Sequence, residues 1–291
     1  YTLNLLSITI FLIPTIILFN YKKIKKLLIL VLTTLLLLIN FMYGSLILKK
    51  NQTINENNLN FVIKIISPKI DIRRYFENES PESIIQELVN LSQPNSEERT
   101  LFIFPEGIFS NIYLEELKNY SYIFSNNYSN QHKIVLGINS ENKNKVYNSL
   151  VVLDKNINIL YQYNKNQLVP FGEFLPFENF LNNFGLKKIT QGYGSFSSSS
   201  ERNILKLNNL NFLPLICYEI IYSGEINKTN DEFDLILNIS EDGWFGNSVG
   251  PDQHFSHSIF RSIEEGKNLI RSANNGISAF INSKGQIIDQ I

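Results

Sequence analysis

Several residue types are scarce in this 291-residue chain, which has one cysteine, one tryptophan and three histidines. A single cysteine cannot form an internal disulfide, so the packed core must supply the stability. The net charge of -1 leaves no basic excess for a nucleic acid partner. His254 and His257 form a His-x-x-His pair, but no third ligand stands at a convincing spacing. We therefore expect no metal and no cofactor.

Acidic residues are absent from residues 1–48, which are strongly apolar. Residues 27–48 form an uncharged run of 22 residues, enough to cross the ~30 Å hydrocarbon core of a bilayer as a helix. Residues 2–19 form a second apolar run, and its Pro14 is tolerable in a helix packed against neighbours. A signal peptide is the competing interpretation. However, the charged residues follow the first apolar run instead of preceding it, and the second run is too long for the hydrophobic region of a signal peptide. We expect two transmembrane helices within residues 1–50.

Lysines give this membrane region an orientation. Four of them lie between the two runs, at 22, 23, 25 and 26, against Lys49 and Lys50 beyond the second. The positive-inside bias therefore places the loop 21–26 in the cytoplasm and the chain after about residue 50 on the extracytoplasmic side. Residue 1 is then also outside, and it is Tyr rather than Met. We expect a fragment that lacks earlier membrane helices and a C-terminal end.

Residues 58–291 have the pattern of an α/β domain. Residues 81–91 carry apolar side chains at helical spacing after Ser80, a candidate N-cap, and residues 253–269 are typical of another helix. Short apolar runs of strand length recur along the rest, and their rhythm predicts a layered fold with sites at the strand ends. The predicted strands are 61–66, 101–104, 134–138, 149–153, 159–163, 212–216, 235–239 and 277–281.

The single cysteine, Cys217, ends one of these apolar runs. A lone cysteine in such a place is most often a small buried hydrophobe. Two charged motifs favour chemistry instead, because Glu106 follows another apolar run, and Lys165 precedes Glu173 in a third segment. A carboxylate can take the thiol proton, and an ammonium can stabilise negative charge on sulfur and then on an oxyanion.

Histidine is the more usual partner of a nucleophilic cysteine. His132, His254 and His257 are the candidates, and folding could bring any of them next to Cys217. None stands in a patterned segment with the cysteine, so a Cys-His site stays open as the lesser alternative. For the His254 and His257 pair, a polar helix face is the simpler interpretation than a metal site.

Three motifs carry a family resemblance: Phe-Pro-Glu at 104–106, Lys-Asn-Gln-Leu-Val-Pro-Phe-Gly-Glu at 165–173, and Cys-Tyr-Glu at 217–219. Their order resembles the Glu-Lys-Cys triad of the nitrilase superfamily. Within it, the wording around 168–176 and the segment 238–250, with Gly-Trp-Phe-Gly, is similar to the bacterial apolipoprotein N-acyltransferases. The resemblance covers nearly all of residues 60–291.

The resemblance implies a nitrilase-like αββα sandwich after the membrane helices, with Glu106 as the base, Lys165 as the oxyanion-stabilising cation and Cys217 as the nucleophile. Supporting roles carry over to three residues of the same motifs, Glu173, Tyr218 and Glu219. Glu173 and Glu219 would orient Lys165 or adjust the proton balance. Trp244 is expected either to wall an acyl pocket or to anchor the structure.

The family's reaction is then expected of this chain. Cys217 would take a fatty acyl chain from a membrane phospholipid as a thioester and pass it to the N-terminal amine of a diacylglyceryl apolipoprotein. The resemblance places the enzyme in the bacterial inner membrane as a monomer, with its active site on the periplasmic side. The alternatives are a membrane-tethered nitrilase-type amidase and an inactive domain that serves as a binding module.

Residues 174–196 are rich in Phe and Leu and then in Gly and Ser. Such apolar residues usually pack in a core. Next to a membrane they could instead form an exposed arm at which lipid enters, and a mobile apolar arm would keep water from a thioester. Phe177 and Phe180 are the substrate-binding candidates of this segment.

Overall fold

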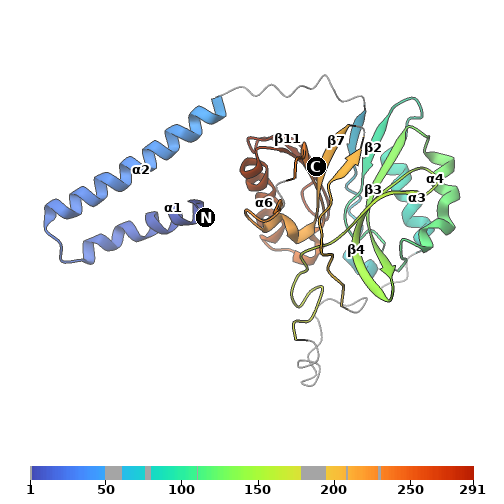
Figure 1. The fold of residues 1–291 in the computed structure, drawn as a ribbon, viewed down its shortest axis with the longest axis horizontal. Coiled ribbons are helices and arrows are strands. Elements are labelled where there is room, and N and C mark those ends of the chain that lie inside the picture. The colour runs from blue at the N-terminus through green and yellow to red at the C-terminus, as the bar shows by residue number, and fades with distance from the viewer. Residues whose placement is uncertain are drawn as a thin grey trace. The chain divides into compact units, whose positions relative to one another are not determined.

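The computed structural model describes residues 2–49, 61–75, 80–109, 111–177, 195–207, 209–228 and 231–291. It divides the chain into two compact units, Tyr1–Asn58 and Leu59–Ile291. The first unit is helical and the second is built from sheets and helices (Figure 1).

In the first unit, α2 (Lys23–Lys49) is a 27-residue helix, long and apolar enough by length and composition to cross a membrane, and none of that apolar stretch is buried. The other apolar run is α1 (Thr2–Leu12) followed by the 3₁₀ helix η1 (Ile13–Leu18). Pro14 lies in the first turn of η1, where its missing N–H interrupts α-helical hydrogen bonding. The run is therefore not one continuous α-helix, and a second membrane span stays a prediction.

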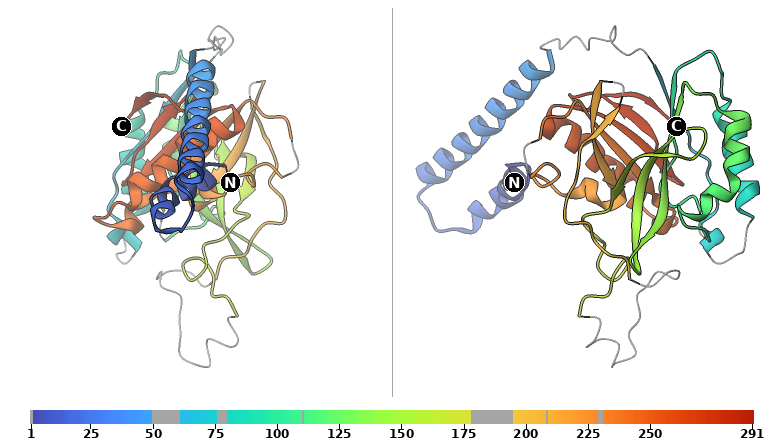
Figure 2. Two further views of the ribbon diagram at one scale, coloured as in Figure 1. Left: turned by 90° about the vertical axis from the view of Figure 1, so that its left-hand side faces the viewer. Right: turned by 45° about the vertical axis from the view of Figure 1, so that its right-hand side comes forward.

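The second unit contains two stacked sheets (Figures 1 and 2). In the first sheet, β1, β2 and β3 are parallel, and β4 and β5 continue antiparallel; their bounds are Val62–Ile65, Thr100–Ile103, His132–Asn142, Lys145–Leu153 and Ile159–Asn164. The second sheet has the order β11-β10-β9-β8-β7-β6, with β7, β8 and β9 parallel. Its bounds are β6 Leu205–Leu207, β7 Leu210–Ile216, β8 Leu235–Glu241, β9 Asn268–Asn274, β10 Ala279–Ile281 and β11 Ile287–Gln290.

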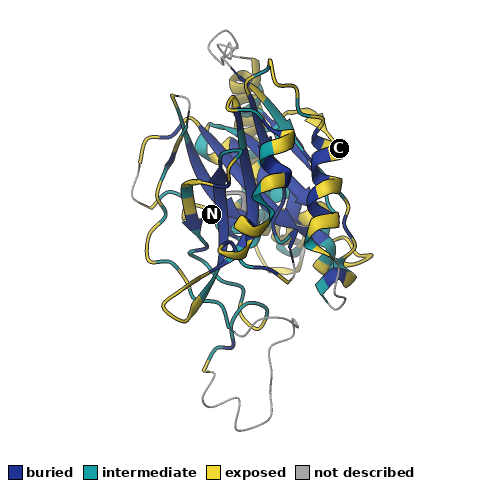
Figure 3. Cartoon of the chain, turned by 90° about the vertical axis from the view of Figure 1, so that its right-hand side faces the viewer, coloured by how far each residue is buried: buried dark blue, intermediate teal, exposed yellow. Residues whose placement is uncertain are grey.

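Helices cover the outer faces of both sheets. α3 (Pro81–Ser92) and α4 (Ser121–Asn127) pack on the first sheet, and α6 (Gly250–Glu265) packs on the second (Figure 1). The helices turn exposed faces outward, while the strands between them are buried (Figure 3). This arrangement confirms the predicted αββα sandwich.

Side-chain alternation explains the layers. In β2, Leu101 and Ile103 join the cluster between the two sheets, whereas Phe102 and the following Phe104 join the cluster under α3 and α4. Strands buried on both faces are therefore continuous apolar runs. That is why β2 is recognisable from the sequence.

The structure refines two predicted helix ends. Ser80 is the N-cap residue of α3 as predicted, although its side chain makes no capping bond; the Ser83 hydroxyl donates to the Ser80 carbonyl. The helix predicted over 253–269 is α6, which ends at Glu265 because Gly266 takes a left-handed φ of 64°. The chain then enters β9, a buried strand whose polar residues make it hard to recognise from the sequence.

Several short 3₁₀ segments connect the strands and helices of the second unit. They are η3 (Ile72–Tyr75), η4 (Glu116–Tyr120), η5 (Cys217–Ile221) and η6 (Asp242–Phe245). Two of them begin directly where a strand ends, η5 after β7 and η6 after β8.

Candidate active site

Three strand ends bring together the residues of the predicted triad. Glu106 lies three residues after β2, Lys165 directly follows β5, and Cys217 directly follows β7. The Glu106 backbone packs closely on β3, where a side chain at Gly137 would approach the Glu106 Cα to 2.5 Å. Glycine is therefore required there so that the Glu106 turn can sit on the sheet.

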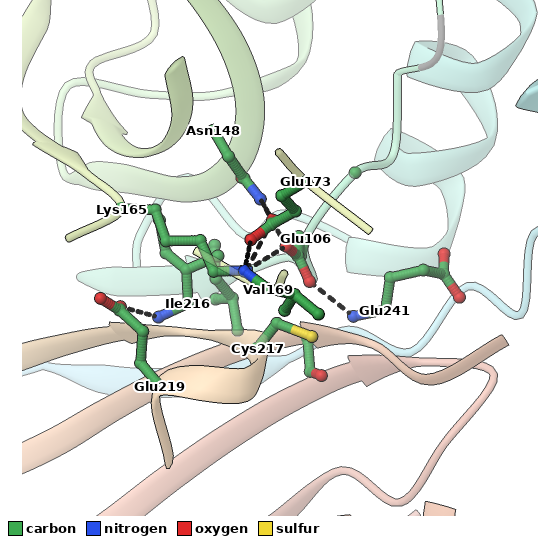
Figure 4. A network of polar contacts seen from close by, with 12 residues as sticks. Glu106, Asn148, Lys165, Val169, Glu173, Ile216, Cys217, Glu219 and Glu241 are labelled. Atoms are coloured by element: carbon green, nitrogen blue, oxygen red, sulfur yellow. Dashed lines mark hydrogen bonds and ion pairs between the residues drawn. The ribbon is translucent and has the colours of Figure 1, made fainter. Parts of the chain in front are cut away.

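Glu106 is a buried carboxylate held from two sides. Its Oε1 accepts a hydrogen bond from Asn148 Nδ2 at 2.6 Å, and its Oε2 accepts one from the backbone N–H of Glu241 at 2.9 Å. Cys217 lies beside this carboxylate (Figure 4). Burial raises the pKa of Glu106, and the nearby Lys165 ammonium opposes that shift. A raised pKa makes this carboxylate a stronger base than an ordinary glutamate.

The Lys165 ammonium lies between two carboxylates, as Figure 4 shows. Its Nζ is 2.8 Å from Glu173 Oε1 and 3.6 Å from Glu106 Oε1. Glu173 is itself fixed by the Val169 N–H, which donates to its Oε2 at 2.9 Å. Burial alone would lower the pKa of Lys165, but Glu173 and Glu106 outweigh burial and hold it well above its usual value. The side chain therefore remains a cation.

Cys217 is partly exposed, so it is not the fully buried hydrophobe that a lone cysteine usually is. It begins η5 with a left-handed φ of 49°, a conformation that costs a non-glycine residue about 1–3 kcal/mol. Dense packing around the sulfur and the charge of Glu106 raise the pKa of the thiol, while Lys165 opposes them. The resting sulfur is therefore protonated and needs a base before it can attack.

Glu219 touches the site differently from what the motif predicts. Its fully buried carboxylate accepts hydrogen bonds from the N–H of Ile216 at 2.8 Å, from the N–H of Asn166 at 3.0 Å and from Arg202 Nη2 at 2.9 Å. These contacts join the turn that carries Cys217 to the loop after Lys165. Glu219 therefore reaches the backbone beside the lysine, whereas Glu173 contacts the ammonium itself.

Tyr218 and Trp244 lie near the triad, and each packs against a tyrosine ring. The Tyr218 ring packs edge-on against Tyr222 at 5.8 Å between centroids. Trp244, in η6, is partly exposed and packs 5.0 Å from the ring of Tyr75. The Tyr75 hydroxyl in turn donates to the Gly107 carbonyl, next to Glu106. Both interpretations of Trp244, pocket wall and anchor, stay predictions.

The candidates of segment 174–196 are only partly described. Phe177 is 85% exposed with a left-handed φ of 53°, and Phe180 lies outside the described residues. Beside the Lys165 loop is an open cavity of about 440 Å³ with aromatic and polar walls. Its lining residues are Asn166, Gln167, Leu168, Phe174, Phe196, Ser198 and Tyr222.

Two of the three candidate histidines, His132 and His254, have defined contacts in the structure. His132 lies at the start of β3, where its ring nitrogens contact Ser129 and Asn95. His254 does reach the cysteine, but its Nε2 lies 3.2 Å from the Cys217 backbone oxygen, so this contact is made to the backbone and not to the thiol. Among the described residues, no group of three or more His, Cys, Asp or Glu side chains is arranged for a metal ion.

Asn148 is a site residue that the sequence analysis missed. Its amide donates to both Glu106 and Glu173, at 2.6 and 3.1 Å, and so fixes the carboxylates around Lys165. It lies in β4 just before the apolar run 149–153. A single Asn in a strand gives no sequence signal for an active site. Its place next to Lys165 follows only from the folded sheet, in which β4 pairs with β5 and the Lys165 N–H donates to the Asn148 carbonyl.

The comparison with protein families supplies the decisive observation. The family model for carbon-nitrogen hydrolases matches residues 101–291, which include Glu106, Lys165 and Cys217. The chain belongs to the carbon-nitrogen hydrolase family. The match begins in β2 and spans most of both sheets of this family member.

The chain also resembles curated proteins named apolipoprotein N-acyltransferase. The protein from Rhizobium leguminosarum bv. trifolii is 35% identical over 238 residues, 78% of this chain and 45% of the relative. The protein from Rickettsia prowazekii is 33% identical over 279 residues, 93% of this chain and 54% of the relative. The chain spans about half the length of these relatives.

Solved structures show the same fold at low identity. The glutamine-dependent NAD+ synthetase from Acinetobacter baumannii aligns with a TM-score of 0.53 at 17% identity, over 79% of this chain and 43% of the other. An amidase from Nesterenkonia sp. AN1 aligns with a TM-score of 0.51 at 12% identity, over 80% and 87%. At such identities the likeness supports the carbon-nitrogen hydrolase fold and no particular substrate.

Proposed function

We propose that this chain carries the active site of an apolipoprotein N-acyltransferase, which moves a fatty acyl chain from a phospholipid through a Cys217 thioester to the N-terminal amine of a lipoprotein. The observation that carries the proposal is that Cys217 lies beside Glu106 (Figure 4), with the Lys165 ammonium 3.6 Å from the same carboxylate. The name of the relatives, apolipoprotein N-acyltransferase, and the apolar helix α2 support a lipid substrate.

The first half-reaction follows from the protonation states. Glu106 takes the thiol proton as the sulfur attacks the ester carbonyl carbon of the phospholipid. The C=O bond opens to an oxyanion, which the fixed charge of Lys165 stabilises. The oxyanion then collapses, the ester C–O bond breaks, and Glu106 returns the proton to the leaving alkoxide. A lysophospholipid departs, and the acyl group stays on Cys217.

The second half-reaction uses the same groups. The amine of the acceptor attacks the thioester carbonyl, Glu106 removes a proton from the nitrogen, and Lys165 again stabilises the oxyanion. The C–S bond breaks, and the thiol recovers its proton. Glu173 holds Lys165, Asn148 holds Glu106, and the hydrogen bond between Asn148 and Glu173 links the two.

The surroundings of the site fit a bulky apolar donor. The cavity lined by Phe174, Phe196 and Tyr222 lies beside the Lys165 loop and is assigned to the substrate. Trp244, Tyr218, Phe177 and Phe180 are assigned to the same acyl-binding region. Residues 1–50 are assigned to an inner-membrane anchor of a monomeric enzyme, with residues 58–291 on the periplasmic side.

The test is acyl transfer in mixed micelles of detergent and phospholipid. The purified chain is given a phospholipid with a labelled acyl chain, and we expect label on Cys217 as a thioester, found by mass spectrometry and released by hydroxylamine. A diacylglyceryl lipopeptide should then receive the label on its amine. The matched control Cys217→Ser keeps the size of the side chain and should take up no hydroxylamine-labile label.

Two outcomes would contradict the proposal. Hydroxylamine-labile label that survives in Cys217→Ser would show that the thioester does not form on Cys217. Label that forms on Cys217 but leaves only as free fatty acid, even with lipopeptide present, would point to a hydrolase of the amidase kind.

A further inference from the structure

A second buried polar cluster lies next to Cys217 without contacting its thiol. We call it the Asp-His-Arg cluster and define it by Asn238, Asp242, His254 and Arg271, which are all at most 3% exposed. Arg271 Nη2 donates to Asp242 at 2.7 and 3.0 Å, and Arg271 Nη1 donates to Asn238. The reaction proposed above uses none of these four side chains.

His254 connects this cluster to the nucleophile. It lies in the second turn of α6, with Nδ1 2.8 Å from Asp242 Oδ1 and 3.1 Å from Arg271 Nη2. Its other nitrogen, Nε2, lies 3.2 Å from the carbonyl oxygen of Cys217. A carbonyl oxygen can only accept, so this contact is a hydrogen bond when Nε2 carries the ring proton; Nδ1 then accepts from Arg271 Nη2, whose guanidinium also binds Asp242.

The contact falls where the backbone needs support. Cys217 has a left-handed φ of 49°, which surrounding structure must hold in place. On one side, Glu219 fixes the N–H of Ile216, the residue before the cysteine. On the other side, His254 fixes the carbonyl of Cys217 itself. The turn that aims the sulfur at Glu106 is therefore held at both ends by buried side chains.

We propose that His254 is a positioning residue for the nucleophile, and that its Nε2–H holds the Cys217 carbonyl so that the sulfur faces Glu106 and Lys165. Asp242 and Arg271 fix the opposite edge of the ring and thereby its orientation. The proposal rests on the role proposed for Cys217, but not on the identity of the acyl donor or acceptor.

Three substitutions separate the two edges of the ring. In His254→Gln the side-chain amide can take the place of Nε2 and donate to Cys217. In His254→Asn the shorter amide takes the place of Nδ1 and keeps the Asp242 edge alone. His254→Met fills similar space with no donor. His257→Gln, one turn further along α6, is the matched control, since His257 is not among the buried residues of this helix.

The readout is the alkylation of Cys217 by iodoacetamide at neutral pH, which is specific because the chain has no other cysteine. Rates are compared in detergent at a temperature where the fluorescence of the single tryptophan, Trp244, shows every variant folded. We expect His254→Gln within about threefold of the native rate and His254→Asn and His254→Met about tenfold slower, since small misplacements of a reacting group cost this much or more. His257→Gln should match the native rate.

A Gln variant no faster than the Met variant, or slower than the Asn variant, would overturn the proposal. If His254→Asn does not fold, the comparison of Gln with Met decides alone. Because iodoacetamide is neither acyl donor nor acceptor, failure of the acyltransferase assay leaves this result intact, and the two proposals fail separately.

Discussion

Two buried charged clusters flank Cys217, and they differ in charge balance. The Glu-Lys cluster, defined by Glu106, Asn148, Lys165 and Glu173, holds two carboxylates around one ammonium. The Asp-His-Arg cluster holds one carboxylate against one guanidinium and an imidazole. The first therefore has a surplus of negative charge, and the second has none.

The pKa values follow this difference. Burial raises the pKa of Glu106, and Lys165, shared with Glu173, does not cancel the shift. Burial also acts on Asp242, but Arg271 outweighs it and lowers the pKa of Asp242 to about 2. A carboxylate short of cations is ready to take a proton, whereas a fully paired one is inert. We infer that the first cluster performs chemistry and the second supports the backbone.

The largest expected effect is on the reaction, in Glu106→Gln. Without the base we expect acylation of Cys217 to slow by about 10²–10⁴-fold. The free energy of unfolding should change by less than about 2 kcal/mol, because the amide loses one hydrogen bond but relieves the surplus charge. Acylation is measured by mass spectrometry and unfolding by Trp244 fluorescence. Glu115→Gln, an exposed carboxylate, is the control, and an unchanged rate in Glu106→Gln would refute the assignment of the base.

For Asp242→Asn we expect a large loss of stability and a smaller loss of acylation rate, the reverse of Glu106→Gln. Removing this carboxylate leaves the Arg271 guanidinium buried without its ion pair, which costs about 3–5 kcal/mol of unfolding free energy. Denaturant titration of Trp244 fluorescence measures this loss, with the exposed Asp252→Asn in the same region as control. The acylation rate of the folded variant should fall less than in Glu106→Gln. A large loss of rate without loss of stability would show that the two clusters do not divide their work in this way.

The sequence predicts the first cluster much better than the second. Glu106 and Cys217 each follow an apolar run that is buried on both faces, so β2 and β7 could be placed within two residues, and the triad with them. The residues of the Asp-His-Arg cluster lie in strands and turns whose partners are remote. Arg271 and Asn238 face each other only because β8 pairs with β9 in this register.

The same reason explains the residues that were missed or misplaced. β9 contains Asn268, Arg271 and Asn274, so no apolar run marks this strand in the sequence. The helix predicted over 253–269 therefore overlaps its first residues. His254 was considered for the thiol, but only the tertiary structure shows that its ring faces the backbone carbonyl of Cys217. Local patterns report strands and motifs, whereas a buried polar network depends on how distant segments pack.

The smallest predicted effect is a pH dependence that belongs to Asp242. Its folded pKa of about 2 lies below the ordinary value, so its contribution to stability is fully present above about pH 4 and is lost as the pH falls toward 2. The difference corresponds to about 2 kcal/mol. His254, whose pKa burial lowers, faces Asp242 and also loses stability on acidification. The two titrations must therefore be separated.

The measurement compares Asp242→Asn with its parent in a His254→Gln background, which removes the imidazole. The gap in unfolding free energy between the two proteins, followed by Trp244 fluorescence, should be constant above about pH 4 and narrow by up to about 2 kcal/mol near pH 2, since His254 itself contributes to the lowered pKa of Asp242. Other carboxylates titrate equally in both proteins and cancel in the difference. A gap that stays constant down to pH 2 would mean that Asp242 keeps an ordinary pKa. The ion pair with Arg271 would then not be what distinguishes this cluster from the one around Glu106.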